Sequence, residues 1–190
     1  LKCVFVTSIL YVHKTSSQQA PGLTSGGCKD VDVVPNITLV DLEGIPYYLK
    51  YTSITLKTKV DGVRMDIVRS GGAENNFTTH YTFINEEKKT KTVESWGLLT
   101  TNEGVNQILN MNVTENYYIL SFEKNVHVLM YICNPRVPTA IDARVLYTVN
   151  TKLNMEEALY IDKQNNFVGE LKLMPNAHIN FLMDQVPTIH

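Results

Sequence analysis

The sequence predicts an all-β protein: an up-and-down barrel of eight antiparallel strands with one α-helix packed outside. The main observation is a hairpin over residues 117–133, where two runs of β-branched and aromatic residues flank a polar turn at 123–125. Both faces of this hairpin are apolar, so both must be covered. A barrel interior can cover one face and an outer helix the other.

The second observation is a regular succession of strand-like runs separated by turn residues. The runs are expected at 47–56, 63–68, 78–84, 91–100, 105–113, 117–122, 126–133 and 143–149. Asp61-Gly62 and Asn102-Glu103-Gly104 are read as two of the turns. Eight successive strands with short turns are typical of an up-and-down barrel.

The pattern becomes helical after the eighth run. Asn154 suits the N-cap, and Glu156 and Glu157 would lie in the first turn, where negative charge is favourable. The apolar residues of this helix of about three turns are Ala158, Leu159, Ile161 and Phe167. Leu159, Ile161 and Phe167 are expected to cover Leu120, Leu129 and Tyr131 of the hairpin. Residues 169–173 suit an edge strand.

Length and composition indicate one domain with an ordinary charge balance. The chain has 190 residues, is 44% hydrophobic, and has 17 basic against 19 acidic side chains. This balance does not suit a nucleic-acid-binding surface. No run approaches the roughly 18 apolar residues needed to cross a bilayer, so an integral membrane protein is not expected.

The N-terminal residues resemble a processing segment. Lys2 precedes a mostly apolar run at 3–12, which turns polar at 13–19. Residues 1–20 are therefore predicted to be a signal peptide, with a first strand or a short buried helix as the alternative. The barrel and its helix would occupy residues 28–175, and residues 176–190 would form a loosely held tail.

Cysteines and sequons support export from the cell. If the leader takes Cys3 with it, Cys28 and Cys133 remain as an even pair, for which a disulfide is expected in a secreted chain. Two buried free thiols are the alternative. Three Asn-x-Thr sequons would accept glycans: Asn36, Asn76 and Asn112. Together these features predict a secreted, extracellular glycoprotein.

From Cys28 to about Phe167 the chain resembles the lipocalins, and most closely the apolipoprotein D and insect bilin-binding branch. The family's cysteine, polar arm and Gly-x-Trp-Tyr motif are matched by Cys28 and by Gly44-Ile45-Pro46-Tyr47. Residues 117–133 have the spacing of the family's hairpin, and Val145-Leu146-Tyr147 resembles its last barrel strand.

The sequence departs from the family at the closed end of the barrel. Pro46 stands where the signature Trp closes the floor, and Val149 stands where an Arg packs on that Trp. Phe122-Glu123-Lys124 replaces Thr-Asp-Tyr. The resemblance still implies that the N-terminal arm crosses the closed end and brings Cys28 to Cys133.

The resemblance implies a carrier for a small lipophilic molecule, such as a pigment like biliverdin, a retinoid, a sterol or a fatty acid, with no required cofactor. Strand parity, taken with the family's cavity positions, places these residues inside: Tyr48, Lys50, Tyr117, Ile119, Val128, Met130, Val145 and Tyr147. An inward Lys50 would pair with a ligand carboxylate or lie at the wet rim; a solvated strand lysine is the plainer alternative. A second hypothesis is that tyrosines fill the barrel, and that the protein acts through its surface as an interaction or storage glycoprotein.

Catalysis and metal binding are not expected. The histidines are scattered and lack a nucleophile motif: His13, His80, His127, His178 and His190. His80 and His127 lie in strand patterns without a second ligand at metal-binding spacing. Strand parity places His127 on the outer face.

Overall fold

The computed structural model describes residues 28–53, 60–72, 74–102, 105–110, 115–133, 143–150, 155–167, 172–173 and 176–185. The long strands are β1 (Pro46–Thr52), β2 (Val60–Arg69), β3 (Asn76–Asn85), β4 (Thr90–Asn102), β5 (Val105–Asn110), β6 (Glu115–Glu123), β7 (His127–Cys133) and β8 (Ala143–Thr148). A short strand, β9 (Lys172–Leu173), and three helices, α1 (Leu39–Leu42), α2 (Met155–Gln164) and α3 (Asn176–Gln185), complete the described elements.

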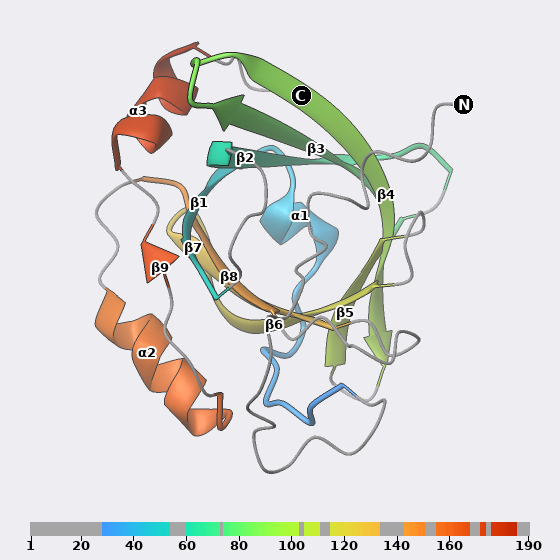
Figure 1. Ribbon diagram of the computed structural model, residues 1–190. Helices are drawn as coiled ribbons and strands as arrows, with labels where there is room; N and C mark the ends of the chain where they lie inside the picture. The colour runs from blue at the N-terminus through green and yellow to red at the C-terminus, as the bar shows by residue number, and fades with distance from the viewer. Residues whose placement is uncertain are drawn as a thin grey trace.

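Strands β1 to β8 close into an antiparallel barrel. Successive strands pair with each other from β2 through to β8, and β1 closes the ring by pairing with both β8 and β2. Viewed along its axis, the barrel forms a ring around α1 (Figure 1). The predicted eight-stranded barrel with a helix outside is therefore confirmed, and all eight strands lie where the period-2 patterns placed them.

The core of the barrel takes side chains from every one of these strands. Their inward residues alternate with outward ones, as the pleat of a strand requires. The buried cluster consists of Ile37, Leu39, Leu42, Tyr47, Leu49, Val63, Met65, Ile67, Phe77, Leu99, Ile108, Tyr117, Ile119, Val128, Met130, Ile132, Ala143, Val145 and Tyr147. We call it the interior cluster.

Helix α1 closes one end of the barrel in place of the family's Trp and Arg. The backbone N–H of Thr38 donates to Oδ2 of Asp41 at 3.0 Å, so the Asp41 side chain caps the start of this short helix. Leu39 and Leu42 are buried in the interior cluster beside Tyr47, the residue that follows Pro46. Apolar packing from α1 and Tyr47 thus forms the floor that Pro46 cannot supply.

A bulge in β6 changes the inward pattern near the hairpin turn. Its register against β7 shifts between Ile119 and Ser121. Leu120 and Ser121 both lie on the outer side, where Ser121 reaches Glu157 of α2, and Phe122 returns to the interior cluster. Strict alternation along the strand would place Phe122 on the same side as Leu120, and the extra residue reverses this parity.

Helix α2 covers the outer face of the hairpin and β8. The outer cluster contains Tyr51, Leu120, Leu129, Tyr131, Cys133, Leu146 and Ala158, with Cys28, Val31, Tyr118, Ile161 and Phe167 packed against it. Ile161 and Phe167 contribute as predicted. Leu159 does not, because it is 47% exposed on the solvent side of α2, and Ala158 takes its place. Phe167 lies beyond the last residue of the helix.

A buried ion pair also fastens α2 to the barrel. Arg144 of β8 donates a hydrogen bond to Asp162 of α2, and both side chains are almost fully buried. The Arg144 guanidinium lies 4.9 Å from the centre of the Phe167 ring. Burial raises the pKa of Asp162, and Arg144 opposes this shift by stabilising the charged carboxylate.

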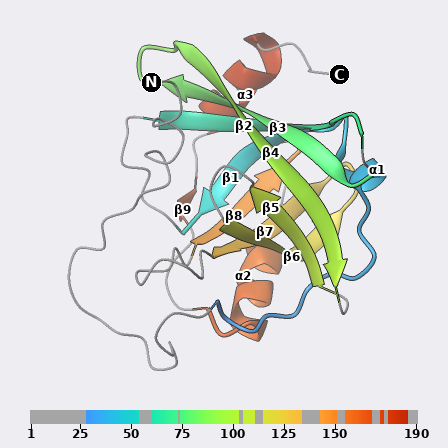
Figure 2. The same cartoon turned by 90° about the vertical axis from the view of Figure 1, so that its right-hand side faces the viewer.

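The C-terminal residues form more structure than the sequence predicted. Residues 176–185 fold into α3, so the expectation of a loosely held tail is corrected for this segment. Ile179 and Leu182 of α3 pack with Tyr48 of β1 and Ile84 of β3. Helices α2 and α3 both lie on the left of the barrel in Figure 1, with α3 above α2, and they are at the bottom and the top of the side view (Figure 2). The predicted edge strand is present as β9, which pairs with β1 at Tyr51 and Thr52.

Gly62 allows α3 to approach the barrel closely. A Cβ at this position would lie 2.9 Å from Ile84 and 3.2 Å from both His178 and Leu182. Gly62 lies within β2 at a register shift, so the prediction of a turn at Asp61-Gly62 is wrong. Because Gly62 has no Cβ, α3 can pack closely against β2 at this position.

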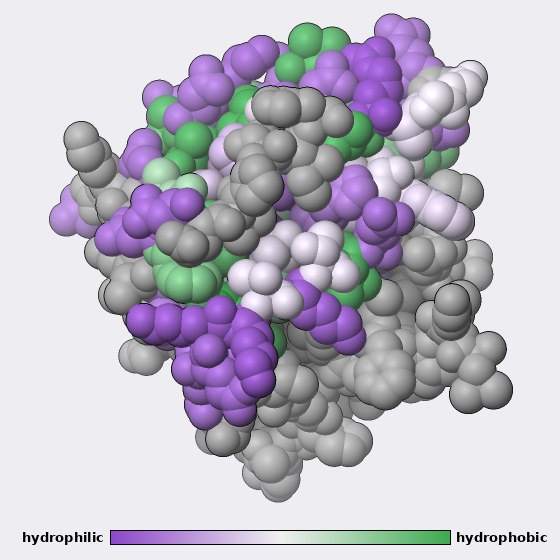
Figure 3. All heavy atoms as spheres, turned by 90° about the horizontal axis from the view of Figure 1, so that it is seen from above, coloured by the Kyte–Doolittle hydropathy of each residue, from purple (hydrophilic) through white to green (hydrophobic). Residues whose placement is uncertain are grey.

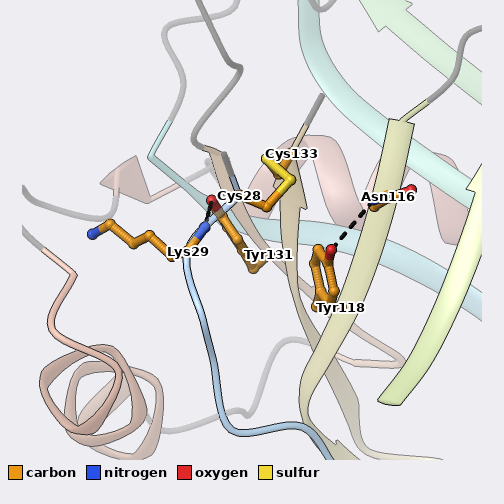
Figure 4. The surroundings of a disulfide bond; sticks show 6 residues. All are labelled: Cys28, Lys29, Asn116, Tyr118, Tyr131 and Cys133. Atoms are coloured by element: carbon orange, nitrogen blue, oxygen red, sulfur yellow. Dashed lines mark hydrogen bonds between the residues drawn. A yellow bond between two sulfur atoms is a disulfide. The ribbon is translucent and has the colours of Figure 1, made fainter. Parts of the chain in front are cut away.

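The disulfide joins the N-terminal arm to the end of β7. Cys28 and Cys133 are bonded, with Cα atoms 5.6 Å apart, and the backbone N–H of Lys29 donates to the Tyr131 hydroxyl at 3.1 Å (Figure 4). The rings of Tyr131 and Tyr118 stack beside the bond at 5.7 Å. The arm is thus held against the outer cluster.

The outer face of β4 carries strongly exposed side chains. Glu94 and Trp96 of β4 are 62% and 56% exposed. Seen from above, hydrophilic side chains cover most of the described surface, with apolar ones in smaller areas between them (Figure 3). Within the described segments, the helices are too short or too polar to cross a membrane.

Candidate functional site

A set of interacting polar side chains is buried within the apolar lining of the barrel interior. Glu115, the first residue of β6, is only 4% exposed. Tyr117 of β6 hydrogen-bonds to Glu115, Tyr81 of β3 lies within electrostatic range of both, and Tyr147 of β8 lies within electrostatic range of Tyr81 and Tyr117. We call Glu115 and these three residues the tyrosine–glutamate group.

Hydrogen bonds and burial define the electrostatics of this group. The Tyr117 hydroxyl donates to Oε2 of Glu115 at 2.9 Å, and Tyr117 and Tyr81 interact electrostatically. Burial raises the pKa of Glu115, and the hydrogen bond from Tyr117 partly offsets the shift. Burial likewise raises the pKa of all three tyrosines, so their hydroxyls are neutral at physiological pH.

The tyrosine–glutamate group lies towards the end of β6 remote from α1. The opposite end of β6 leads into the turn that contains Lys124, whose ammonium is 3.5 Å from a carboxylate oxygen of Asp41 in α1. Glu115 is nine positions before Lys124, at the start of the strand. The apolar floor formed by α1 and Tyr47 and the tyrosine–glutamate group therefore occupy different ends of the interior.

Six of the eight residues predicted to line the barrel lie in the interior cluster. These are Tyr117, Ile119, Val128, Met130, Val145 and Tyr147. Tyr48 does not join them: it packs outside, against α3, while Tyr47 and Leu49 point inward. Both faces of β1 are covered, so its alternation does not reveal which one is inside.

Lys50 is also not placed as predicted. It is the extra residue of a bulge in β1, where the register against β8 shifts between Leu49 and Tyr51. Its ammonium lies 5.9 Å from the ring centre of Tyr51, which belongs to the outer cluster. The side chain is buried, which lowers the pKa of its ammonium. The expected pairing of an inward Lys50 with a ligand carboxylate is not supported by this placement.

Sequence reasoning missed Glu115 and Tyr81. Glu115 belongs to the same parity as Tyr117 and Ile119, so a strand begun two residues earlier would have placed it inside. It fell between the expected strands 105–113 and 117–122, and was therefore assigned to the connection. Tyr81 was within an expected strand and shares its parity with Phe77 and Phe83.

The predicted glycosylation sites are on different parts of the fold. Asn36 is exposed before α1, with a positive φ of 61°. Asn76 is partly exposed at the start of β3. Asn112 lies outside the described residues. Glycan attachment at all three stays a prediction.

A second polar group lies outside the barrel, beneath α2. His127 is buried on the outer face of β7, as parity predicted, and its Nε2 is 2.8 Å from Ser121 Oγ and 3.7 Å from Glu157 Oε1. A catalytic triad needs the acid on the other ring nitrogen, yet Nδ1 has no hydrogen-bond partner among the described residues. This arrangement is not that of a nucleophile with an oriented base.

The described residues contain no group of three or more His, Cys, Asp or Glu side chains that could hold a metal ion. His80 faces outward, 3.5 Å from Glu94. The interior group is therefore the candidate functional site of the described structure, and hydrogen bonding and electrostatic attraction are what it can supply chemically.

Comparison with solved structures identifies the architecture. The amine-binding protein of Rhodnius prolixus, in complex with tryptamine, matches with a TM-score of 0.60 at 12% identity, over 86% of this chain and 97% of that one. Lobster apocrustacyanin A1 matches with a TM-score of 0.59 at 13% identity, over 84% and 95% of the two chains. The siderocalin Ex-FABP gives 0.57 at 12% identity, over 71% and 94%.

No protein-family model matches the sequence, and no curated protein matches it significantly. The likeness is thus one of structure at low identity. These neighbours are lipocalins. The match covers between 94% and 97% of each of their chains. The barrel with a C-terminal helix matches the lipocalin architecture. The chain has the lipocalin fold.

Proposed function

We propose that this protein is a secreted lipocalin that binds and carries a small lipophilic molecule inside its barrel. The observation that supports this is the composition of the interior: apolar side chains from all eight strands surround a buried, hydrogen-bonded pair of polar residues, Glu115 and Tyr117. Small-molecule sites are typically built this way, with an apolar lining for affinity and a few polar groups for orientation. Burial of a ligand contributes about 25 cal/mol per Å² of apolar surface before binding costs are subtracted.

The solved neighbours support binding rather than catalysis. One of them is described as an amine-binding protein in complex with tryptamine, and another as a siderocalin with dual ligand specificities. We extend small-molecule binding to this chain, without an enzymatic activity or a required cofactor. The apolipoprotein D and bilin-binding branch remains our proposal from the sequence motifs.

Secretion is supported by the disulfide between Cys28 and Cys133. Such bonds persist in oxidising compartments and are rare in the cytosol of mesophiles. The apolar N-terminal run and the three sequons agree with export. We therefore propose an extracellular site of action.

A Met130→Trp variant tests the interior site. Met130 is 2% exposed in the interior cluster, so an indole there would occupy ligand space. We expect the affinity for the neutral fluorophores Nile red and N-phenyl-1-naphthylamine to fall at least about tenfold, with overpacking costing roughly 1–3 kcal/mol of stability. Fluorescence titration and thermal unfolding measure the two effects.

Glu94→Trp is the matched control, because Glu94 is exposed on the outer wall. It should leave binding unchanged. If folded Met130→Trp protein binds both fluorophores as tightly as the parent does, the interior is not the site.

That result would favour the second hypothesis, a filled barrel that acts through its surface as an interaction or storage glycoprotein. One feature speaks for it: Tyr117 and Tyr81 come from strands that are not neighbours in the ring, and their side chains interact electrostatically inside it. The same hydroxyls would otherwise orient a ligand.

A further inference from the structure

We infer that the preferred ligand is a cation, whose protonated amine is bound by Glu115 and the hydroxyls of Tyr81, Tyr117 and Tyr147. This inference rests on the proposed function, and it specifies the ligand's chemistry. It is opposite in charge to the ligand carboxylate that an inward Lys50 would have paired with, which was one of the alternatives drawn from the sequence.

The first support is the unbalanced charge inside the barrel. A carboxylate removed from water is costly unless a cation and hydrogen bonds compensate it. Among the described residues, Glu115 has a hydrogen bond from Tyr117 but forms no ion pair with Lys, Arg or His. A carboxylate has about four acceptor positions, so Glu115 retains capacity for an ammonium ion.

The second support is the chemistry of the three tyrosines. An ammonium group has three N–H donors, and each phenolic oxygen accepts hydrogen bonds as well as donating them. Tyrosine rings also attract cations through their faces. Because Tyr81, Tyr117 and Tyr147 come from three different strands, they can surround one positively charged group from several sides.

The third support is the position of the basic residues nearest to the interior. Lys50 lies at its bulge beside the outer cluster. Lys91 lies opposite Phe83 on the inward register of β4, but it is exposed near the start of the strand. A ligand carboxylate at the tyrosine–glutamate group would therefore meet the like charge of Glu115.

The charge states also give a direction for pH dependence. Burial raises the pKa of Glu115, so its carboxylate takes up a proton at a higher pH than an exposed glutamate does. The groups that face it, Tyr81, Tyr117 and Tyr147, stay neutral throughout the acidic range. Affinity for an amine should thus fall as the pH decreases through the pKa of Glu115.

Three indoles of matched shape test the inference by calorimetry at pH 7: tryptamine as the cation, tryptophol as the neutral analogue and indole-3-propionate as the anion. The parent protein should bind tryptamine at least about tenfold more tightly than the other two. Glu115→Gln should weaken tryptamine binding about 10- to 100-fold and leave tryptophol nearly unchanged. Glu94→Gln, the same change on the outer wall, should alter neither affinity.

Stability separates a binding role from a structural one. The folded-state pKa of Glu115 is raised, so its charge destabilises the fold fully above that pKa, and the penalty is absent below the unfolded-state pKa. Glu115→Gln can still accept the hydrogen bond from Tyr117. We therefore expect it to melt at a higher temperature than the parent at pH 7, with the difference shrinking towards pH 4.

The inference is overturned if tryptamine has no advantage over tryptophol, or if Glu115→Gln binds tryptamine as the parent does. It is also overturned if Glu115→Gln melts lower at pH 7, since Glu115 would then stabilise the fold. If Nile red still binds and Met130→Trp blocks it, these failures leave the proposed function intact. If the parent protein binds neither Nile red nor any of the indoles, both the inference and the proposed function are contradicted.

Discussion

A Leu129→Asp variant is expected to be unfolded or aggregated under conditions in which the parent is fully folded. Leu129 is completely buried in the outer cluster, between the barrel wall and Ala158 of α2. Losing a buried leucine typically costs about 2–5 kcal/mol, and an unpaired buried carboxylate costs several more. The sum is comparable with the roughly 5–15 kcal/mol that stabilises an ordinary domain.

Circular dichroism and size-exclusion chromatography would measure this effect. Leu159→Asp is the matched control, because Leu159 lies one residue along α2 from Ala158 but is 47% exposed. It should change the stability by no more than about 0.5 kcal/mol. A soluble Leu129→Asp variant with unchanged melting would show that α2 does not cover this face.

Removal of the disulfide is expected to produce the second large loss. Cys28 and Cys133 are separated by 105 positions, and the chain-entropy relation gives about 4.7 kcal/mol for a loop of that length. Measured losses in small secreted domains are about 2–5 kcal/mol. A Cys28→Ser/Cys133→Ser double variant should thus lose a substantial part of its free energy of unfolding.

Urea denaturation of the double variant and of the parent, with and without reductant, would measure the loss. Reductant should destabilise the parent by a similar amount and leave the variant unchanged. Recovery of two free thiols from unreduced parent protein, or equal stability of variant and parent, would contradict the expectation.

The strands could be predicted from the sequence because their signal is local. Alternation and turn residues located all eight, and the inward side of β6 to β8 was correct at Tyr117, Val128 and Val145. The disulfide partners followed from the family resemblance and from the even number of cysteines that remain after the predicted leader is removed.

The predicted side-chain orientations that were wrong depend on contacts between residues far apart in the sequence. In β1, Tyr47 and Tyr48 are both buried, since the barrel interior covers one and α3 the other. No local pattern distinguishes these faces until α3 is known. The bulge in β6 similarly reverses the side on which Phe122 lies, through a single extra residue.

The interior carboxylate was missed for a different reason. An acidic residue beside a polar turn usually belongs to the surface, and burial of a charge goes against the ordinary preference of glutamate. Glu115 departs from this preference within an otherwise consistent strand. Such departures are where sequence reasoning is expected to fail at functional sites.

The pairing of β1 also determines the order in which the fold can be completed during synthesis. The seam between β1 and β2 is short, from Pro46 opposite Asp66 to Tyr48 opposite Arg64, and α3 packs over it. The other strands that pair with β1 are β8 and β9, which are synthesised much later. Roughly 90 residues separate β1 from β8, or about 5–20 s of translation at ordinary rates. For that interval β1 has an unpaired edge, so the nascent chain must be protected from aggregation until its C-terminal part arrives.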